Sequence, residues 1–135
     1  MRQGKTNKGY IGLLLLVHGL ITFAASVVLI LAPAAIPKMV DIYISPDPYL
    51  LCYFLGAAQM SIAFLSFFAR NISDPYALRI VCSSFIVFHI ATALLEIYAF
   101  IKGVDSAILF NTGLRILISI LLWYYGIYKA RKQEK

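Results

Sequence analysis

The sequence predicts an all-α polytopic membrane protein whose four transmembrane helices pack as an antiparallel bundle. Apolar residues make up 61% of the 135 residues and charged residues 13%, against about 45–50% and about 25% in soluble domains. The charges also cluster, leaving four long stretches that are almost free of them. Such a composition excludes a soluble enzyme, a disordered tail and a disulfide scaffold.

The uncharged stretches place the spans at about 10–32, 49–69, 76–101 and 106–128. Each is long enough to cross a hydrocarbon core of about 30 Å at 1.5 Å per residue. Lipid offers backbone groups no partner, so continuous apolar runs of this length must be helices. Their apolar residues do not alternate with polar ones, which excludes the strands of a membrane β-barrel. We expect a single domain that covers residues 1–135.

Prolines mark the helix ends. Asp47 and Asp74 each precede a proline, so both are predicted to be N-caps with Pro48 and Pro75 at the first helical position. Pro33 is expected to end the first helix. The first apolar run resembles a signal peptide, but it exceeds the usual length of about 7–15 residues, so we expect it to remain as a span. The apolar connection that follows is predicted to lie in the interface or fold over the bundle.

The basic residues predict the orientation. Lys38 and Lys102 fall at one end of the expected bundle, whereas nine fall at the other: Arg2, Lys5, Lys8, Arg70, Arg79, Lys129, Arg131, Lys132 and Lys135. Cytoplasmic loops carry the excess of lysine and arginine. We therefore expect a multi-pass protein of the cytoplasmic (cell) membrane with both termini in the cytoplasm.

The net charge of +6 has the same origin. Its basic residues flank membrane segments and form no folded basic face, so we expect contact with membrane lipids and no binding of nucleic acid. A homo-oligomer or a membrane-protein partner is compatible with the sequence, which favours neither.

Two charged residues fall inside the spans, where a charge costs a few kcal/mol and is usually paired or functional. Glu96 lies in the third span and Arg115 in the fourth. A short turn joins these spans, so folding the chain at that turn brings Glu96 level with Asn111 and one turn from Arg115. We predict a Glu96–Arg115 ion pair with Asn111 as a third member.

Further polar residues extend this candidate site. His89 shares the helix face of Glu96, and we place it near the middle of the membrane with Gln59 and Arg115, with His18 nearer the cytoplasmic side. Three interpretations remain open. The groups form a structural polar network, they line a pocket for a small molecule or lipid headgroup, or they form a proton or ion path, since histidine titrates near neutral pH.

Sequence motifs for catalysis are absent. The chain has no G-x-G-x-x-G, Walker, H-E-x-x-H or G-x-S-x-G pattern, and its histidines are far apart in sequence. We therefore predict no catalytic residue, no metal site and no cofactor. Cys52 and Cys82 fall near opposite membrane faces, which makes a disulfide between them unexpected.

The chain resembles DoxX-like and related families of small four-helix membrane proteins. The resemblance rests on a first helix that contains glycine and ends at Pro33, a long first connection, a tight second connection from Arg70 to Asp74, and Arg115 within the last helix. Members of such families are similar to accessory subunits or are of unknown activity, which implies no defined catalytic residue.

Taken together, the sequence favours an integral membrane protein with a polar pocket in the outer half of the bundle. We expect it to be a non-catalytic accessory protein or one that binds a small ligand or lipid. One alternative is a small proton-coupled transporter that works as an oligomer, with Glu96 as the coupling carboxylate and His89 and His18 as relays. Small multidrug transporters are similar in size but carry their essential glutamate in the first helix, where this chain has His18. Another alternative is a membrane enzyme that acts on a lipid or quinone.

Overall fold

The computed structural model is all-helical, as the sequence predicts. It describes the backbone of residues 3–132 and the side chains of residues 9–131, so the side chains of Arg2, Lys5, Lys8, Lys132 and Lys135 lie outside the described residues. The elements in order are α1 (Gln3–Leu31), α2 (Ala35–Lys38), α3 (Tyr49–Ala69), α4 (Pro75–Ile101), α5 (Ile108–Leu122), the π-helical segment η1 (Trp123–Tyr128) and α6 (Lys129–Lys132).

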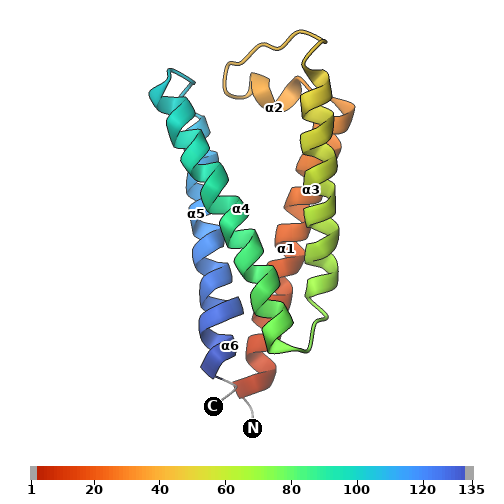
Figure 1. Ribbon diagram of the computed structural model, residues 1–135, viewed down its shortest axis with the longest axis vertical. Coiled ribbons are helices and arrows are strands. Elements are labelled where there is room, and N and C mark those ends of the chain that lie inside the picture. Colours follow the sequence, from red (N-terminus) through yellow and green to blue (C-terminus); the bar gives the residue numbers. More distant parts are fainter. Residues whose placement is uncertain (1–2, 133–135) are drawn as a thin grey trace.

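The long helices form two antiparallel hairpins (Figure 1). Helix α1 pairs with α3, and α4 pairs with α5. The hairpins meet at the end of the molecule where α1 begins and α6 ends, which we call the terminal end. They separate toward the opposite end, the far end, where α2 and the turn between α4 and α5 lie.

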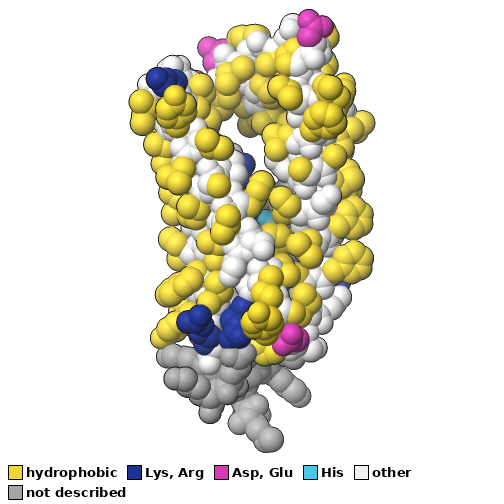
Figure 2. All heavy atoms as spheres, viewed as in Figure 1, with side chains coloured by type: hydrophobic (Ala, Val, Ile, Leu, Met, Phe, Trp, Pro, Cys, Tyr) yellow, Lys and Arg dark blue, Asp and Glu magenta, His cyan; other side chains and the backbone are white. Residues whose placement is uncertain are grey.

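Four helices of the described chain are long and apolar enough to cross a membrane: Gly9–Leu31, Tyr49–Ala69, Pro75–Ile101 and Ile108–Arg131. These segments agree with the predicted spans to within a few residues. Large apolar side chains are exposed along all of them, for example Ile21 at 66%, Leu51 at 68% and Val87 at 68%, and Figure 2 shows them over both hairpins. In water so large an apolar surface would drive association. The chain is therefore a multi-pass membrane protein.

An apolar core joins the two hairpins in the half nearer the terminal end. It draws residues from all four long helices: Ile11, Leu15, Ala69, Cys82, Phe85 and Leu122. Leu15, Cys82 and Leu122 are fully buried. Lipid tails are as apolar as these side chains, so close packing rather than exclusion of water holds this junction together.

Small residues bring α1 and α3 together. The Ser26 hydroxyl donates a hydrogen bond to the carbonyl of Gly56 (2.8 Å). A Cβ at Gly56 would lie 3.2 Å from the carbonyl oxygen of Ser26, and one at Gly19 would lie 2.7 Å from the ring of Phe67. Glycine at both positions thus permits the close approach of these two helices.

The two predicted aspartate caps have different outcomes. Asp74 is the N-cap of α4, because its carboxylate accepts hydrogen bonds from the backbone of Tyr76 and Ala77 (3.1 and 3.2 Å). The prediction for Asp47 is wrong. The N-cap of α3 is Pro48, and no side-chain hydrogen bond caps the start of this helix. A preceding turn, closed by the bond from the Tyr49 N–H to the Pro46 carbonyl, shifts the helix start one residue beyond the aspartate.

The connections at the far end also follow local chemistry. Helix α1 ends at Leu31, before Pro33, and the chain then forms the short helix α2 beside the end of α1. Gly103 adopts φ +101° directly after α4, a conformation that favours glycine. Asp105 accepts a hydrogen bond from the Ala107 N–H (2.7 Å), a turn at the start of α5 that the sequence analysis missed.

The last span changes from α-helix to π-helix at Trp123. Gly126, in this segment, is buried against Cys82 of α4. A Cβ at Gly126 would lie 2.9 Å from the Cβ of Cys82 and closer still to its sulfur. The absence of a side chain therefore lets the wider π turn pack directly on α4.

We expect Gly126→Ala to destabilise the protein by about 1–3 kcal/mol, because the added methyl group overpacks the contact with Cys82. Thermal unfolding in detergent, followed by the fluorescence of Trp123, measures the change. Gly113→Ala is the matched control, since nothing lies within 4 Å of a Cβ at that position in the middle of α5.

Cys82→Ala in the Gly126→Ala background removes the sulfur and is expected to restore part of the loss. Equal stability of the Gly126→Ala and Gly113→Ala variants would contradict the close η1–α4 contact.

Candidate functional site

The polar residues predicted inside the membrane meet between α4 and α5. Arg115 Nε donates to Glu96 Oε1 at 2.8 Å, which is the ion pair expected from the sequence. Asn111 Nδ2 donates to the same oxygen at 2.6 Å, as its predicted place as a third member requires. Both charged side chains are largely buried, with exposed fractions of 15% for Arg115 and 11% for Glu96.

The Glu96 carboxylate has a third donor that sequence reasoning missed. The Thr112 hydroxyl donates to Glu96 Oε2 at 2.9 Å. Thr112 lies seven residues before Ser119, so the two share a face of α5, and both are buried. This seven-residue spacing is the feature of the sequence that could have identified Thr112 as part of the site. Both oxygens of the carboxylate accept hydrogen bonds, which fix the group in position opposite Arg115.

Two histidines continue the polar chain away from Arg115. Arg115 Nη1 lies 3.5 Å from His89 Nδ1, and His89 Nε2 lies 2.9 Å from His18 Nε2. His18 Nδ1 lies 2.6 Å from the hydroxyl oxygen of Ser66. These contacts run through α5, α4, α1 and α3 in turn, so one chain of side chains crosses all four long helices.

The arginine fixes the direction of the chain. A guanidinium only donates, so His89 Nδ1 accepts from Arg115 and is unprotonated. The Nε2–H of His89 then donates to His18 Nε2, and the Nδ1–H of His18 donates to Ser66. Both imidazoles are neutral and have opposite tautomers. This assignment of tautomers follows from the Arg115 guanidinium, the one group in the chain that can only donate.

The bond between His18 and His89 joins the two hairpins. Their rings meet edge to face, with centroids 5.0 Å apart. The ring of His18 also packs on Phe85, a member of the apolar core, at 5.0 Å. The polar chain therefore lies directly on the far side of that core and extends the contact between the hairpins by one further layer.

The depths predicted for two site residues need correction. His18 was expected nearer the cytoplasmic side than His89, but their 2.9 Å contact puts them level. Gln59 was expected level with His89, yet it lies seven residues, about 10.5 Å, toward the far end from Ser66. Glu96 lies seven residues toward the far end from His89. The hairpins are tilted relative to each other, so counting residues from the end of each span does not give the depth of a residue in the bundle.

Gln59 stays outside the hydrogen-bonded chain. It is half-buried and shares the face of α3 that carries Ser66, and its side chain makes no hydrogen bond within the described part of the chain. Of the six residues predicted for the site, the structure brings five together: Glu96, Arg115, Asn111, His89 and His18.

A hollow opens between the hairpins in the half toward the far end (Figure 2). Histidine and basic side chains show on its inner wall, and apolar side chains surround it. The polar chain therefore borders a space within the membrane-spanning part of the molecule. The enclosed apolar core lies on its other side.

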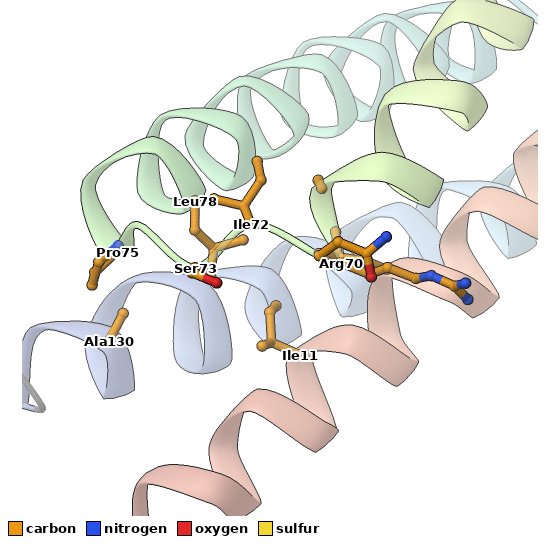
Figure 3. A pocket seen from close by; sticks show the side chains of 10 residues that line it. Ile11, Arg70, Ile72, Ser73, Pro75, Leu78 and Ala130 are labelled. Atoms are coloured by element: carbon orange, nitrogen blue, oxygen red, sulfur yellow. The ribbon is translucent and has the colours of Figure 1, made fainter.

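A second, smaller cavity lies at the terminal end, between α1, the connection from α3 to α4, and α6 (Figure 3). Its volume is about 110 Å³, well below the roughly 300 Å³ of small-molecule sites. Arg70, Asn71 and Ser73 contribute polar groups, so it has room for a few waters at most. Within residues 3–132, His, Cys, Asp and Glu form no group of three suited to a metal ion.

Comparison with protein families, curated proteins and solved structures found no match to this chain.

Replacing one partner of the ion pair should lower the stability of the protein more than replacing both partners. We expect Glu96→Leu to lower stability by about 3–5 kcal/mol, because the guanidinium of Arg115 loses its counter-ion while it stays buried. The double variant Glu96→Leu/Arg115→Met leaves no buried charge and should fall within about 1–2 kcal/mol of the parent. Unfolding by titration with SDS measures the parent protein and the two variants.

Ser61→Ala is the control, because this exposed hydroxyl on α3 bonds only to its own helix. Additive losses, with the double variant less stable than Glu96→Leu, would contradict the coupling of the two charges.

Proposed function

We propose that this membrane protein binds a small amphipathic molecule, a lipid or lipid-like ligand, in the hollow between its hairpins, and that it performs no catalysis. We further propose that it lies in the cytoplasmic membrane with both termini in the cytoplasm. The basic residues Arg70, Arg79, Lys129 and Arg131 at the terminal end support that orientation.

The unused donors of Arg115 carry the proposal. A guanidinium has five N–H groups, of which Arg115 uses one toward Glu96 and one toward His89. The remaining three have no hydrogen-bond partner within the described residues, although the guanidinium also lies over the ring of Phe88, 5.8 Å from its centroid. An unsatisfied donor in a low-dielectric site is costly. A ligand with acceptor oxygens would supply what these donors lack.

The charge of the site favours a neutral ligand over an anion. Glu96 is the single charge between Arg79 and Lys102, and Arg115 is the single charge between Asp105 and Lys129. The pair sums to zero. An added anion would leave one net charge inside the membrane and would be repelled by Glu96. A carbonyl or ester oxygen accepts the same hydrogen bonds without that cost.

Gln59 supports a ligand that spans the hollow. It lies on the α1–α3 hairpin, as far from the Ser66 level as Glu96 lies from the His89 level. Its amide provides a donor and an acceptor opposite the Glu96–Asn111–Arg115 group. Two polar walls with apolar surroundings match a molecule that has a small polar head and a hydrocarbon tail.

One observation favours a second candidate, a proton-coupled transporter. The side chains from Glu96 to Ser66 form an unbroken chain across four helices, the type of array that carries protons in membrane pumps. Against it, Glu96 accepts three hydrogen bonds and pairs with Arg115. These bonds hold the carboxylate in one position against Arg115, which does not suit a group that must pass protons on.

Binding of 1,2-dioleoylglycerol, as a neutral lipid with ester oxygens, tests the proposal. Native mass spectrometry of the protein in mild detergent should show a one-to-one complex. Glu96→Gln/Arg115→Gln keeps the site uncharged but removes the guanidinium, and we expect its affinity to fall about tenfold or more. Gln59→Leu should weaken binding less, and Ser61→Ala should leave it unchanged.

Equal binding to the parent and the Glu96→Gln/Arg115→Gln variant would contradict the site. Tighter binding of oleate than of dioleoylglycerol would keep the lipid site but contradict the proposal that its ligand is neutral. Flux driven by a pH gradient in proteoliposomes, lost in Glu96→Gln, would favour the transporter instead.

A further inference from the structure

A second binding feature lies on the outside of the α4–α5 hairpin at the terminal end. It is a groove of about 520 Å³ between the first three turns of α4 and the end of the last span. Figure 2 shows basic side chains gathered at this place, next to apolar ones. The ion-pair site plays no part in it.

Two rows of side chains on α4 form one wall of the groove. Arg79, Ser83 and Val87 follow one another at four-residue spacing, and beside them run Tyr76, Ile80 and Ser84. Residues four apart on a helix lie on the same face. Each row thus extends from the membrane surface into the apolar interior.

The second wall brings another arginine to the same level. Gly126 of η1 packs on Cys82 of α4, which sets the register of these antiparallel helices. Arg131 lies five residues beyond Gly126, so it is level with Ala77, which lies five residues before Cys82. Arg79 is two residues from Ala77. Arg131 therefore lies across the groove from Arg79, and both line it.

The groove has a basic end near the membrane surface, where Arg79 and Arg131 lie. By the register of Gly126 on Cys82, Ile127 lies just beyond Arg79, and Ser83, Ser84 and Val87 lie deeper. Arg79 and Val87 are eight residues apart, about 12 Å along the helix. Ile80, next to Arg79, is 51% exposed and Val87 is 68% exposed, so the groove offers apolar surface to a hydrocarbon chain from the arginines inward.

We propose that this groove binds an anionic phospholipid, with the phosphate between Arg79 and Arg131 and one acyl chain along Val87 and Ile127. Guanidinium groups bind phosphate oxygens through paired hydrogen bonds, and the Ser83 hydroxyl on the same wall can donate to a further oxygen. The Ser84 hydroxyl instead donates to the Ile80 carbonyl of its own helix (3.0 Å).

A membrane lipid is favoured over a free phosphate ion because the groove continues past the arginines into apolar surface that a free ion would not use. The position agrees with the proposed orientation, since the cytoplasmic leaflet holds the anionic lipids. The inference does not depend on a ligand in the hollow.

Native mass spectrometry with added dioleoylphosphatidylglycerol tests the groove. Arg79→Gln/Arg131→Gln should bind this lipid about tenfold to thirtyfold more weakly than the parent. Lys38→Gln/Lys102→Gln is the matched control, because it removes the same charge at the far end, and its affinity should stay within about twofold of the parent. Dioleoylphosphatidylcholine should bind weakly to all three proteins.

Two further measurements keep the test decisive. Val87→Gln retains both arginines and should still weaken binding, because it places a polar group under the acyl chain. Inorganic phosphate at the same concentration should not compete. Equal losses in the two double variants, or an unchanged affinity in Val87→Gln, would overturn the proposal. Competition by inorganic phosphate would reassign the groove to a free anion and overturn the lipid.

Discussion

One guanidinium inside the membrane constrains this structure more than any other group. Arg115 cannot lose its charge, and lipid cannot solvate it. Glu96 therefore neutralises it across the α4–α5 hairpin, while Asn111 and Thr112 hold the carboxylate in place. The need for acceptors also extends beyond the hairpin. His89 accepts from Arg115, and the donor it then offers is taken by His18.

This chain of requirements divides the molecule into layers. On the terminal side, apolar residues from four helices pack into a closed core. The histidines lie on that core and form the last contact layer between the hairpins. Beyond them the hairpins separate and the hollow begins (Figure 2). The donors of Arg115 that remain unused are thus located where the closed half of the bundle meets its open half, a suitable position for a bound lipid.

The sequence predicted most of the fold because membrane insertion leaves few choices. Charge spacing alone located the spans, and the short turn after the third span made the Glu96–Arg115 pair a matter of counting residues. The errors came where geometry depends on packing. Asp47 lost its predicted capping role to a preceding turn, and hairpin tilt brought His18 level with His89 and left Gln59 farther out. No periodicity in the sequence reports the angle between two hairpins, so the sequence predicts a polar pocket but not the separation of the hairpins that shapes the hollow.

The direct measurement of the central claim is the tautomer of each histidine, read from the ¹⁵N chemical shifts of the imidazole rings in detergent micelles at neutral pH. Donation from Arg115 through His89 to His18 requires that His89 carry its proton on Nε2 and His18 on Nδ1. In the double variant Arg115→Met/Glu96→Leu, no guanidinium donates to His89, so the two histidines should no longer be restricted to these tautomers. The same tautomer at both histidines of the parent protein, or a doubly protonated ring at either, would contradict a polar chain directed by Arg115.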